Sequence, residues 1–433
     1  MKKISLILSI TAIVLSCQKE VTVSLTTSLP TVITDTVTTI TFPTATSGGI
    51  VTDDGGDSVT ARGVCWDTIA NPTIAGNHTI DGSGLGSFTS VITGLQPSTV
   101  YYTRAYATNS IGTAYGNVVM ISTQIDIYVV GGQYGLGGAN SKATVWKNGV
   151  ATLLTNGTNY ASAFGGCVVG TDVYIVGFEN SNFNHVATIW KNGIPTRLSN
   201  PSHNAIAKSV FFSGTDVYVV GYEETGNPYT AKLWKNGVST TLSSTSNNGQ
   251  AYSVFVSNND VYVVGFEQNS SGTWGRVWKN GISILYTADA FDAYAVFVSG
   301  ADVYVAGTKH LNGNNYATVW KNGIGTPLSN GSGDARASSV IVSGTDVYAA
   351  GYEQLSPGHP IGTIWKNGVA THLTATGYDG YAEEVRVVGS EVYVAGFDYN
   401  NSSYTSAKLY KNGVPNVLPI TEVYSFANSM FVK

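Results

Sequence analysis

The sequence predicts an all-β protein, and three features support this: the composition, a series of internal repeats, and short apolar segments separated by turn residues. Charged residues make up 11% of the 433 residues, hydrophobic residues reach 43%, and there are 50 glycines and 26 tyrosines. Disordered chains combine low hydrophobicity with high charge, so disorder is excluded. Helix-favouring residues are scarce beside so much Gly, Thr, Ser, Tyr and Val, which argues against helical bundles. The net charge of −5 argues against a nucleic-acid partner, which needs a clustered basic surface.

The first residues predict a secretion signal that ends at a lipid attachment site. Lys2 and Lys3 give a positive start, and the apolar run over residues 4–14 is too short to span a bilayer as a stable helix. The segment 14–17, Val-Leu-Ser-Cys, resembles the lipobox of bacterial lipoproteins. That resemblance implies cleavage before Cys17 and a lipid on its thiol.

The same resemblance implies a place in the bacterial cell envelope. Residues 1–16 would be the signal peptide, and residues 17–28 would form a lipidated tether. Segment 18–20, Gln-Lys-Glu, is similar to the surface-export signals of Bacteroidetes lipoproteins. We therefore expect membrane attachment through lipid on Cys17, because acyl chains give lasting anchorage when more than one is present. The expected location is the outer membrane; display at the cell surface is left open.

Residues 29–124 contain short strand patterns separated by turn residues. Segment 94–109 holds a Leu-x-Pro-x-Thr-x-Tyr corner and resembles the end of a fibronectin type III module, where such a corner fixes a loop against the next strand. Segments 62–66 and 111–116 resemble the variant found in Bacteroidetes lipoproteins. We expect a fibronectin type III-like β-sandwich. Three carboxylates in loop 53–57 would suit calcium, although a solvated hairpin loop is the preferred interpretation.

From residue 125 onward the chain repeats one pattern seven times. Trp-Lys-Asn-Gly recurs at steps of 44, 44, 44, 42, 45 and 45 residues. It begins at Trp146, Trp190, Trp234, Trp278, Trp320, Trp365 and, in a variant, Tyr410. A second marker is Asp-Val-Tyr-Val-x-Gly, and a third has the form Ala-x-Ser-Val-Phe-Val-Ser-Gly. Repeats of this length with several short strands each are the signature of a β-propeller, so residues 125–433 predict seven blades of about 44 residues.

The two ends of the repeat region predict how the propeller closes. The region opens with the second strand of a blade, at 126–130, and finishes with an unpaired first strand at 425–432. Pairing these segments completes the first blade and removes an exposed strand edge. The strand order resembles that of Kelch propellers, although their diglycine is present only at Gly131-Gly132. The near-continuous apolar strands indicate that both sheet faces are covered, so we expect the repeated tryptophans to pack between blades.

Candidate binding residues lie on one face of this expected propeller. The loops between second and third strands share that face with the loops between blades, and we call it the loop-rich face. Identical repeat positions are explained by packing, so a site is expected where the copies differ. Aromatic rings among amides and carboxylates suit sugars or peptides, whereas the alternative is that each ring only caps its own loop. The candidates are Tyr134, Phe183, Tyr229, Trp274, Tyr316, Tyr404, Asp292, Asp334 and Arg336.

A further set of polar residues follows the second strand of each repeat. Five are acids, which would attract a cation or a basic partner, but solvated strand ends are the preferred interpretation. The set is Gln133, Glu179, Glu223, Glu267, Lys309, Glu353 and Asp398.

Catalysis finds little support in the sequence. The six histidines share no repeat position, and motifs such as His-Glu-x-x-His, Gly-x-Ser-x-Gly and the P-loop are missing. A carboxylate pair from different blades, Asp292 with Asp334 or Glu383, would act on glycosides if about 5–10 Å apart. We expect no cofactor and no metal, and we expect Cys65 and Cys167 to be free thiols inside apolar strands.

Three hypotheses for function remain. The leading one is a monomeric, lipid-anchored envelope protein whose propeller binds a glycan or a protein on the loop-rich face. The second is a glycan-active hydrolase or lyase that uses carboxylates on that face. The third is a purely structural surface module.

Overall fold

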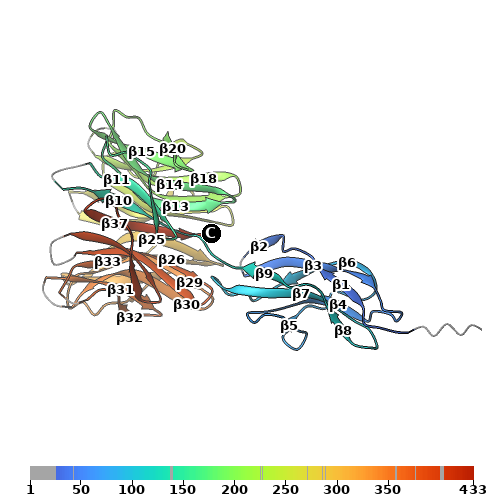
Figure 1. The fold of residues 1–433 in the computed structure, drawn as a ribbon. Coiled ribbons are helices and arrows are strands. Elements are labelled where there is room, and N and C mark those ends of the chain that lie inside the picture. Colours follow the sequence, from blue (N-terminus) through green and yellow to red (C-terminus); the bar gives the residue numbers. More distant parts are fainter. Residues whose placement is uncertain are drawn as a thin grey trace, which may run out of the picture. The chain divides into compact units, whose positions relative to one another are not determined.

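The computed structural model describes residues 26–433 except 42, 137–139, 225, 227, 271, 285, 288, 356–357, 376 and 400–403. The predicted signal segment, Cys17 and the export-signal match lie outside the described residues. All regular secondary structure in the described part is β-strand, which confirms the all-β prediction (Figure 1). No helix in that part is long and apolar enough to cross a membrane. The chain divides into two compact units, Met1–Thr123 and Gln124–Lys433.

The first unit has two antiparallel sheets that share one hydrophobic core. One sheet contains β1 (Thr31–Thr34), β3 (Thr44–Asp53), β2 (Thr39–Thr41) and β6 (Gly86–Ile92). The other contains β5 (Asn77–His78), β4 (Ala61–Asp67), β7 (Val100–Thr108), β8 (Thr113–Tyr115) and β9 (Val119–Ser122). Buried side chains of both sheets form a single cluster. The backbone N–H of Gln96 donates to Tyr101 Oη at 2.9 Å, so segment 94–109 makes a corner contact of the expected kind.

The carboxylates of loop 53–57 serve the backbone around them. Asp53 Oδ1 accepts the N–H of Gly55 at 2.7 Å, and Asp54 Oδ1 accepts the N–H of Gly56 at 2.9 Å. In the part of the chain that the structure describes, no group of three or more His, Cys, Asp or Glu is placed to hold a metal ion. These contacts therefore explain the aspartates of the loop as turn residues.

The second unit contains seven four-stranded antiparallel sheets within its described residues. From the innermost strand outwards, the first sheet consists of β37 (Tyr424–Val432), β10 (Ile127–Tyr134), β11 (Lys142–Lys147) and β12 (Val150–Leu153). The second consists of β13 (Ala161–Val169), β14 (Asp172–Ser181), β15 (Asn184–Lys191) and β16 (Ile194–Arg197). The third consists of β17 (Ala205–Ser213), β18 (Asp216–Glu224), β19 (Tyr229–Lys235) and β20 (Val238–Thr241).

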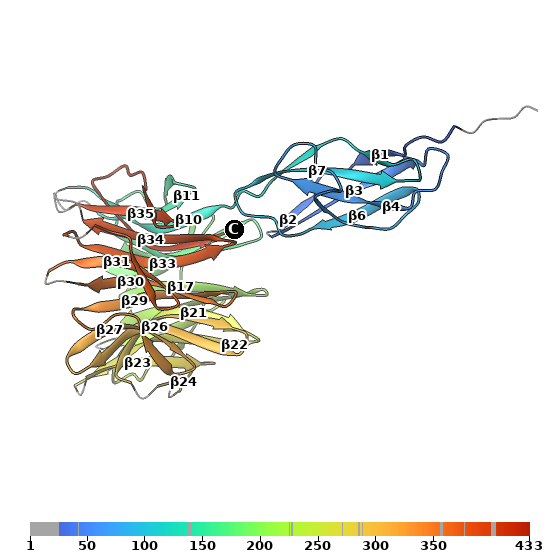
Figure 2. The ribbon, with the colours of Figure 1, turned by 90° about the horizontal axis from the view of Figure 1, so that it is seen from below.

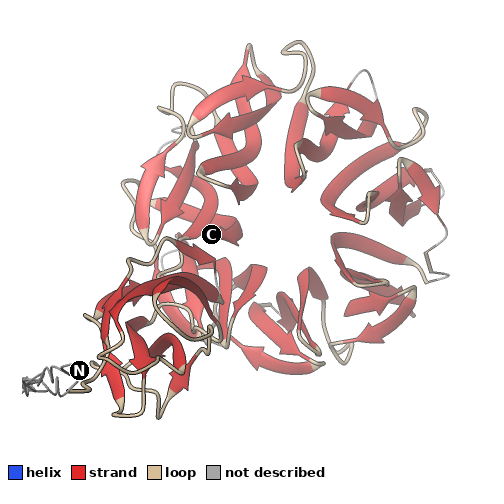
Figure 3. Ribbon diagram, turned by 90° about the vertical axis from the view of Figure 1, so that its right-hand side faces the viewer, coloured by secondary structure: helices blue, strands red, loops and turns tan. Residues whose placement is uncertain are grey.

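The next four sheets follow in chain order and repeat this layout. The fourth sheet consists of β21 (Asn248–Ser257), β22 (Asp260–Asn269), β23 (Gly272–Lys279) and β24 (Ile282–Ile284), and the fifth of β25 (Phe291–Ser299), β26 (Asp302–Leu311), β27 (Asn314–Lys321) and β28 (Ile324–Pro327). The sixth consists of β29 (Ala335–Ser343), β30 (Asp346–Gln354), β31 (Pro360–Lys366) and β32 (Val369–His372), and the seventh of β33 (Gly380–Val388), β34 (Glu391–Tyr399), β35 (Thr405–Lys411) and β36 (Val414–Val417). The innermost strands of neighbouring sheets lie side by side and return to the start, so the unit is a β-propeller-like ring (Figure 3). Figure 2 shows the same sheets from the side of the ring.

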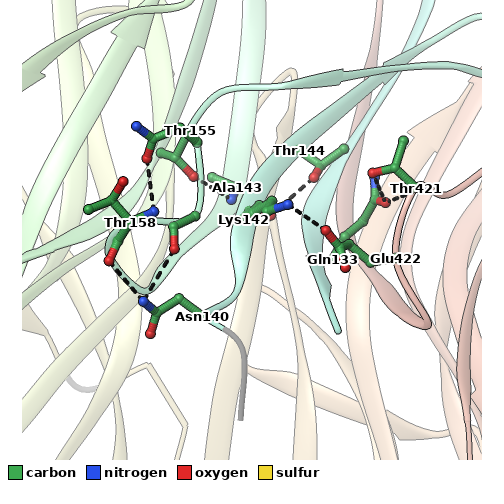
Figure 4. Close-up of polar contacts among 11 residues, drawn as sticks. Gln133, Asn140, Lys142, Ala143, Thr144, Thr155, Thr158, Thr421 and Glu422 are labelled. Atoms are coloured by element: carbon green, nitrogen blue, oxygen red, sulfur yellow. Dashed lines mark hydrogen bonds and ion pairs between the residues drawn. The ribbon is translucent and has the colours of Figure 1, made fainter. Parts of the chain in front are cut away.

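The ring closes by pairing strands from the two ends of the unit, as the sequence predicts. Strand β10 pairs with β37 from Ile127 opposite Val432 to Tyr134 opposite Tyr424. Next to this ladder, the N–H of Thr421 donates to Gln133 Oε1 at 2.8 Å, and Lys142 forms an ion pair with Glu422 (Figure 4). The termini of the unit are therefore held by backbone and side-chain contacts together.

The repeated Tyr and Trp-Lys-Asn-Gly motifs meet at one edge of each sheet, which we call the tight-turn edge. In the sheet of β22 and β23, Lys279 Nζ lies 2.7 Å from Asp260 Oδ2 and 5.3 Å from the centre of the Tyr262 ring. Asn280 Nδ2 donates to Asp260 Oδ1 at 2.8 Å, and Asn280 Oδ1 accepts the N–H of Val261 at 2.8 Å. The φ of Asn280 is 52°, in the left-handed region that Asn tolerates. These contacts explain the repeated residues as structural.

The six repeated tryptophans are at most 1% exposed, which confirms their expected packing role. They lie in clusters formed by residues of adjacent sheets; Trp278, for example, packs among side chains of β18, β19, β21 and β22. Burying a large apolar side chain contributes about 1.5–3 kcal/mol, so each junction between sheets is substantially stabilised.

Candidate functional site

Every innermost strand of the ring contains a β-bulge at the same repeat position. In β25 the register passes from Ala293 opposite Gly307 to Ala295 opposite Ala306, which leaves Tyr294 without a partner on β26. The seven residues left out in this way, which we call the bulge ring, are Phe164, Lys208, Tyr252, Tyr294, Ser338, Glu383 and Asn428. A bulge redirects a side chain out of the pleat. All seven line one central cavity of about 620 Å³.

Two repeated small residues create these bulges. The alanine before each bulge residue is at most 1% exposed in all seven copies. The glycine of the Asp-Val-Tyr-Val-x-Gly marker lies opposite, where a Cβ would come within 1.8–2.0 Å of a carbonyl oxygen on the innermost strand. At Gly265, for example, the Cβ would lie 1.9 Å from the carbonyl oxygen of Gln250. Only glycine permits this approach of the two backbones.

The bulge ring lies nearer to the loop-rich edge of the sheets than to the tight-turn edge. Tyr294, for example, is three positions after Phe291, the first residue of β25, and five before Ser299, its last. In the register of β25 with β26, Phe291 pairs with Lys309, close to the end of β26, where the loop to the third strand begins. The interblade loops and the second-to-third-strand loops therefore share this edge, as expected from the sequence.

Lys208 is the positively charged residue of the bulge ring. It forms no ion pair or hydrogen bond within the described residues. Its Nζ lies 3.7 Å from the centre of the Phe164 ring. Burial lowers the pKa of Lys208 to about 8, and the negative charge of Glu383 opposes this by a smaller amount. Most Lys208 side chains are therefore charged at neutral pH, although the charge is poorly solvated.

Arg336, by contrast, is fully paired. Its Nη2 donates to both carboxylate oxygens of Glu383, at 2.8 and 3.0 Å, and its Nε donates to Ser338 Oγ at 3.0 Å. The guanidinium also lies 5.0 Å from the centre of the Tyr294 ring and 5.3 Å from that of Tyr352. Burial opposes the charge, but Glu383 together with Tyr294, Tyr352 and Tyr381 outweighs it, and the pKa of Arg336 is raised. Arg336 and Glu383 thus act as a neutral pair.

A second neutral pair lines the cavity beside the first. Arg386 donates to Glu384 Oε1, which also accepts the hydroxyl of Ser339 at 2.8 Å. The other carboxylate oxygen of Glu384 accepts the hydroxyl of Ser429 at 3.3 Å. Both carboxylates of the cavity are therefore held by an arginine.

Two tyrosines provide an aromatic wall. The rings of Tyr252 and Tyr294, on neighbouring innermost strands, have centres 5.6 Å apart and planes 30° apart. Tyr252 Oη donates to Gln250 Oε1 at 3.1 Å. Burial raises the pKa of both hydroxyls, so both tyrosines are neutral and can donate or accept hydrogen bonds.

Of the nine residues predicted to bind ligand, Arg336 lines the central cavity. It lies on the innermost strand β29 rather than in an interblade loop. Asp292 and Asp334 are engaged elsewhere: Asp292 Oδ2 lies 3.0 Å from His310 Nε2, and Asp334 accepts Asn315 Nδ2 at 2.8 Å and Tyr352 Oη at 3.0 Å. The carboxylates considered as a catalytic pair, including Glu383, thus each have a partner of their own.

The six predicted aromatic residues are not gathered into one site. Tyr134 stacks on Tyr424, with ring centres 4.5 Å apart, and Tyr404 contacts the same ring edge-on. Tyr229 packs edge-on against Tyr222. Phe183 is fully exposed at the turn between β14 and β15. These contacts agree with the alternative in which several rings cap their own loops.

The remaining two predicted aromatics also lie apart from the central cavity. Trp274 lines a separate cavity of about 410 Å³ together with Arg276, Tyr286 and Asp289. Tyr316 lies against the loop at Gly331, where an added Cβ would come within 2.3 Å of its ring.

The expectation of solvated residues after the second strands is wrong for several of them. Gln133, Glu223, Glu267 and Glu353 are at most 8% exposed. Some of these residues bind the linker that enters their own sheet: Glu267 Oε1 accepts the N–H of Ser244 at 3.0 Å, in the same way that Gln133 binds Thr421. A linker backbone that passes over a strand end needs acceptors for its N–H groups, and these side chains supply them.

The bulge ring is not predicted from the sequence, because packing accounts for the Ala-x-Ser-Val marker as a whole. The signal was present: the x position differs in every copy except the pair Tyr252 and Tyr294, between residues that barely change. At such a position, the same backbone geometry places a different side chain in each repeat.

The two cysteines in the described residues are free, as expected. Burial raises the pKa of Cys65 to about 11 and that of Cys167 to about 12. Both remain thiols at neutral pH and do not suit nucleophilic chemistry.

No protein-family model and no characterised protein matches the sequence. Among solved structures, TolB from Acinetobacter baumannii is similar over 79% of this chain and 81% of its own, with 9% identity and a TM-score of 0.43. A DUF4784 family protein from Bacteroides caccae covers 94% and 99%, with 10% identity and a TM-score of 0.28. The FN1–FN3 domains of chicken CNTN1 cover 92% and 98%, with 10% identity and a TM-score of 0.15. Likenesses this distant carry no argument about this chain.

Proposed function

We propose that the chain is a lipid-anchored protein of the bacterial cell envelope whose seven-bladed, Kelch-like propeller binds a glycan in its central cavity. The observation that carries the proposal is the bulge ring. Seven sheets present side chains of six chemical types to one cavity, whereas the residues around each bulge are nearly the same. Packing alone does not call for this diversity.

The chemistry of the cavity suits a sugar. A volume of about 620 Å³ lies within the range of pockets for small ligands and is too small for a folded protein partner. Tyr252 and Tyr294 line the cavity with aromatic surface, which suits the apolar face of a sugar ring. Glu383, Asn428 and Ser338 offer hydrogen-bonding groups for hydroxyls. The position of the bulge ring supports entry from the loop-rich face.

The other parts of the proposal rest on the sequence and on the first unit. The lipobox resemblance at residues 14–17 supports the anchor on Cys17 and the envelope location. The two sheets of the first unit and the contact of Gln96 with Tyr101 support a fibronectin type III-like module, which lies in the sequence between the anchor and the propeller. The hydrolase hypothesis is not favoured, because Glu383 and Glu384 are each held by an arginine.

A glycan array probed with the full mature chain tests this function. We expect binding to one class of glycan and at least tenfold weaker binding by Tyr252→Leu and by Tyr294→Leu, which keep apolar bulk but lose the planar ring and the hydroxyl. The matched control is Phe183→Leu, at an exposed turn outside the cavity, which should bind like the parent.

Two results would contradict the proposal. One is an array without any binding by the parent chain. The other is a bound glycan whose affinity falls in Phe183→Leu but not in the two tyrosine variants, which would move the site to the loops. Thermal unfolding of each variant separates lost binding from lost folding.

A further inference from the structure

Among the charged side chains that line the central cavity, one positive charge is not paired with a negative one. The charged side chains that line it are Lys208, Arg336, Glu383, Glu384 and Arg386. The two arginines are paired with the two glutamates. Lys208 is left as a cation without a counter-ion among the described residues.

Lys208 is only partly exposed, and its unpaired ammonium group needs an explanation, because withdrawing a charge from water without a partner is costly. The nearby face of Phe164 offers a cation–π contact, but this does not replace a counter-ion. A methionine or leucine would pack against Phe164 without the penalty. The lysine is therefore better explained by what it contacts when the cavity is filled.

We propose that Lys208 binds a single carboxylate on the ligand, so that the glycan recognised by the propeller contains a uronic acid. This inference rests on the proposed function and specifies its ligand. A neutral sugar would leave Lys208 without a counter-ion. A phosphate monoester carries close to two negative charges at neutral pH, and the cavity has no second unpaired cation to meet them.

The place of Lys208 in the ring fits a sugar acid. Lys208 and Tyr252 occupy equivalent bulge positions on β17 and β21, which lie side by side. Lys208 Nζ lies against the ring of Phe164 on the other neighbouring strand, and Tyr252 lines the same cavity, so a sugar whose carboxylate binds Lys208 shares the cavity with both aromatic side chains. Each carboxylate–ammonium contact of this kind is a charge-assisted hydrogen bond, stronger than a bond between neutral groups.

The protonation of Lys208 can be followed through the pH dependence of ligand binding. Glu383 is the acidic group that acts on it, and that carboxylate is held by Arg336. His185 is also affected by Lys208: burial lowers the pKa of the imidazole, and the positive charge of the lysine lowers it further. Tyr252 and Tyr294 have raised pKa values. Between pH 7 and 9.5, Lys208 is thus the cavity group expected to change charge, and uronide binding should weaken as the pH rises.

Isothermal titration with simple glycosides tests the assignment. The probes are the methyl glycosides of glucuronic, galacturonic and mannuronic acid, the corresponding neutral glycosides, and their 6-phosphates. At pH 7 we expect the full mature chain to bind one uronide at least tenfold more tightly than its neutral and phosphorylated counterparts. The preference should be lost in Lys208→Met and should shrink at pH 9.5.

Two further variants separate binding by Lys208 from a general effect on the protein. Lys208→Arg keeps its charge at high pH, so the uronide preference should persist at pH 9.5. Lys279→Met removes a lysine from the tight-turn edge and should leave the preference unchanged.

The results distinguish this inference from the proposed function. Equal binding of neutral glycosides and uronides, unaffected by Lys208→Met, would overturn the carboxylate assignment and leave glycan binding standing. Tighter binding of the 6-phosphates would also overturn it. If none of the probes binds and the glycan array is blank, both proposals fail together.

Discussion

The tight-turn edge and the bulge ring use the same seven sheets in opposite ways. At the tight-turn edge, Lys and Asp are 2.7 Å apart in six sheets, and the seventh has Lys411 with Glu391 at 3.4 Å. At the bulge ring, a backbone geometry fixed by alanine and glycine presents Phe, Lys, Tyr, Tyr, Ser, Glu and Asn. The difference teaches that repeated contacts stabilise the ring, whereas the varied positions are available for recognition.

Removing the closing strand should have the largest effect on both regions. Deletion of residues 425–433 leaves β10 without its inner partner strand. It also removes the buried Met430 and Phe431, of which Phe431 stacks on Tyr128 with ring centres 5.1 Å apart. Each large side chain contributes about 1.5–3 kcal/mol, so we expect a loss of several kcal/mol in the free energy of unfolding. Chemical denaturation measures it. An unfolding curve identical to that of the parent would show that closure does not stabilise the ring.

A substitution at the bulge should come next. Gly265→Ala places a methyl group 1.9 Å from the carbonyl oxygen of Gln250, so the two strands must separate. We expect a loss of about 1–3 kcal/mol, typical of overpacking, seen as a lower denaturation midpoint. The control is Gly76→Ala, where the nearest atom is 3.7 Å away. Equal effects of the two substitutions would contradict the account of the bulge.

A substitution at the tight-turn edge should cost less and should be the same in every copy. Asn280→Ala places an alanine at a φ of 52° and removes the bond from the N–H of Val261. We expect a loss of about 1–2 kcal/mol. Asn322→Ala, at a φ of 50° with an equivalent bond from Val303, should give the same value, and glycan binding should not change in either variant. Different losses at the two sites would break the equivalence of the copies.

The most specific effect on stability should come from Lys208→Met, through its pH dependence. The folded pKa of Lys208, about 8, lies below the ordinary value of 10.5, so the unfolded chain binds the proton more tightly. The penalty for the charged lysine is therefore full below about pH 8 and disappears as the pH approaches 10.5. Lys208→Met should be more stable than the parent at pH 7, with the difference shrinking by pH 10.

Lys279→Met is the contrasting variant for this measurement. The hydrogen bond to Asp260 raises the pKa of Lys279, so its contribution is stabilising below its ordinary pKa and is lost as the pH rises through the raised value. This variant should be less stable than the parent at pH 7. Denaturation at pH 7, 8.5 and 10 measures both differences. If the two variants shifted in the same direction at pH 7, the contrast between the two regions would fail.

The fold was largely predictable from sequence because its signals are local and repeated. The Trp-Lys-Asn-Gly spacing, the apolar strands, and the unpaired segments at 126–130 and 425–432 predict the sheets and the pairing that closes them. The site was not predictable from sequence, because the direction of its side chains depends on the register between neighbouring strands. Nothing in the alternation of β21 shows that Tyr252 is skipped by β22.

Long-range contacts explain the other misses. Tyr134 looked available on a loop, yet it stacks on Tyr424, which arrives only when the ring closes. Glu267 looked solvated at a strand end, yet the linker at Ser244 passes over it. In both cases the partner comes from a different part of the chain, whose path the local pattern does not specify.

A crystal structure of the mature chain with its tightest-binding glycan tests the central claim most directly. The account predicts density for the sugar in the central cavity, against the ring of Tyr252 and with a carboxylate at Lys208 Nζ. Density on the outer loops around Phe183 or Trp274, with the central cavity holding only water, would contradict it.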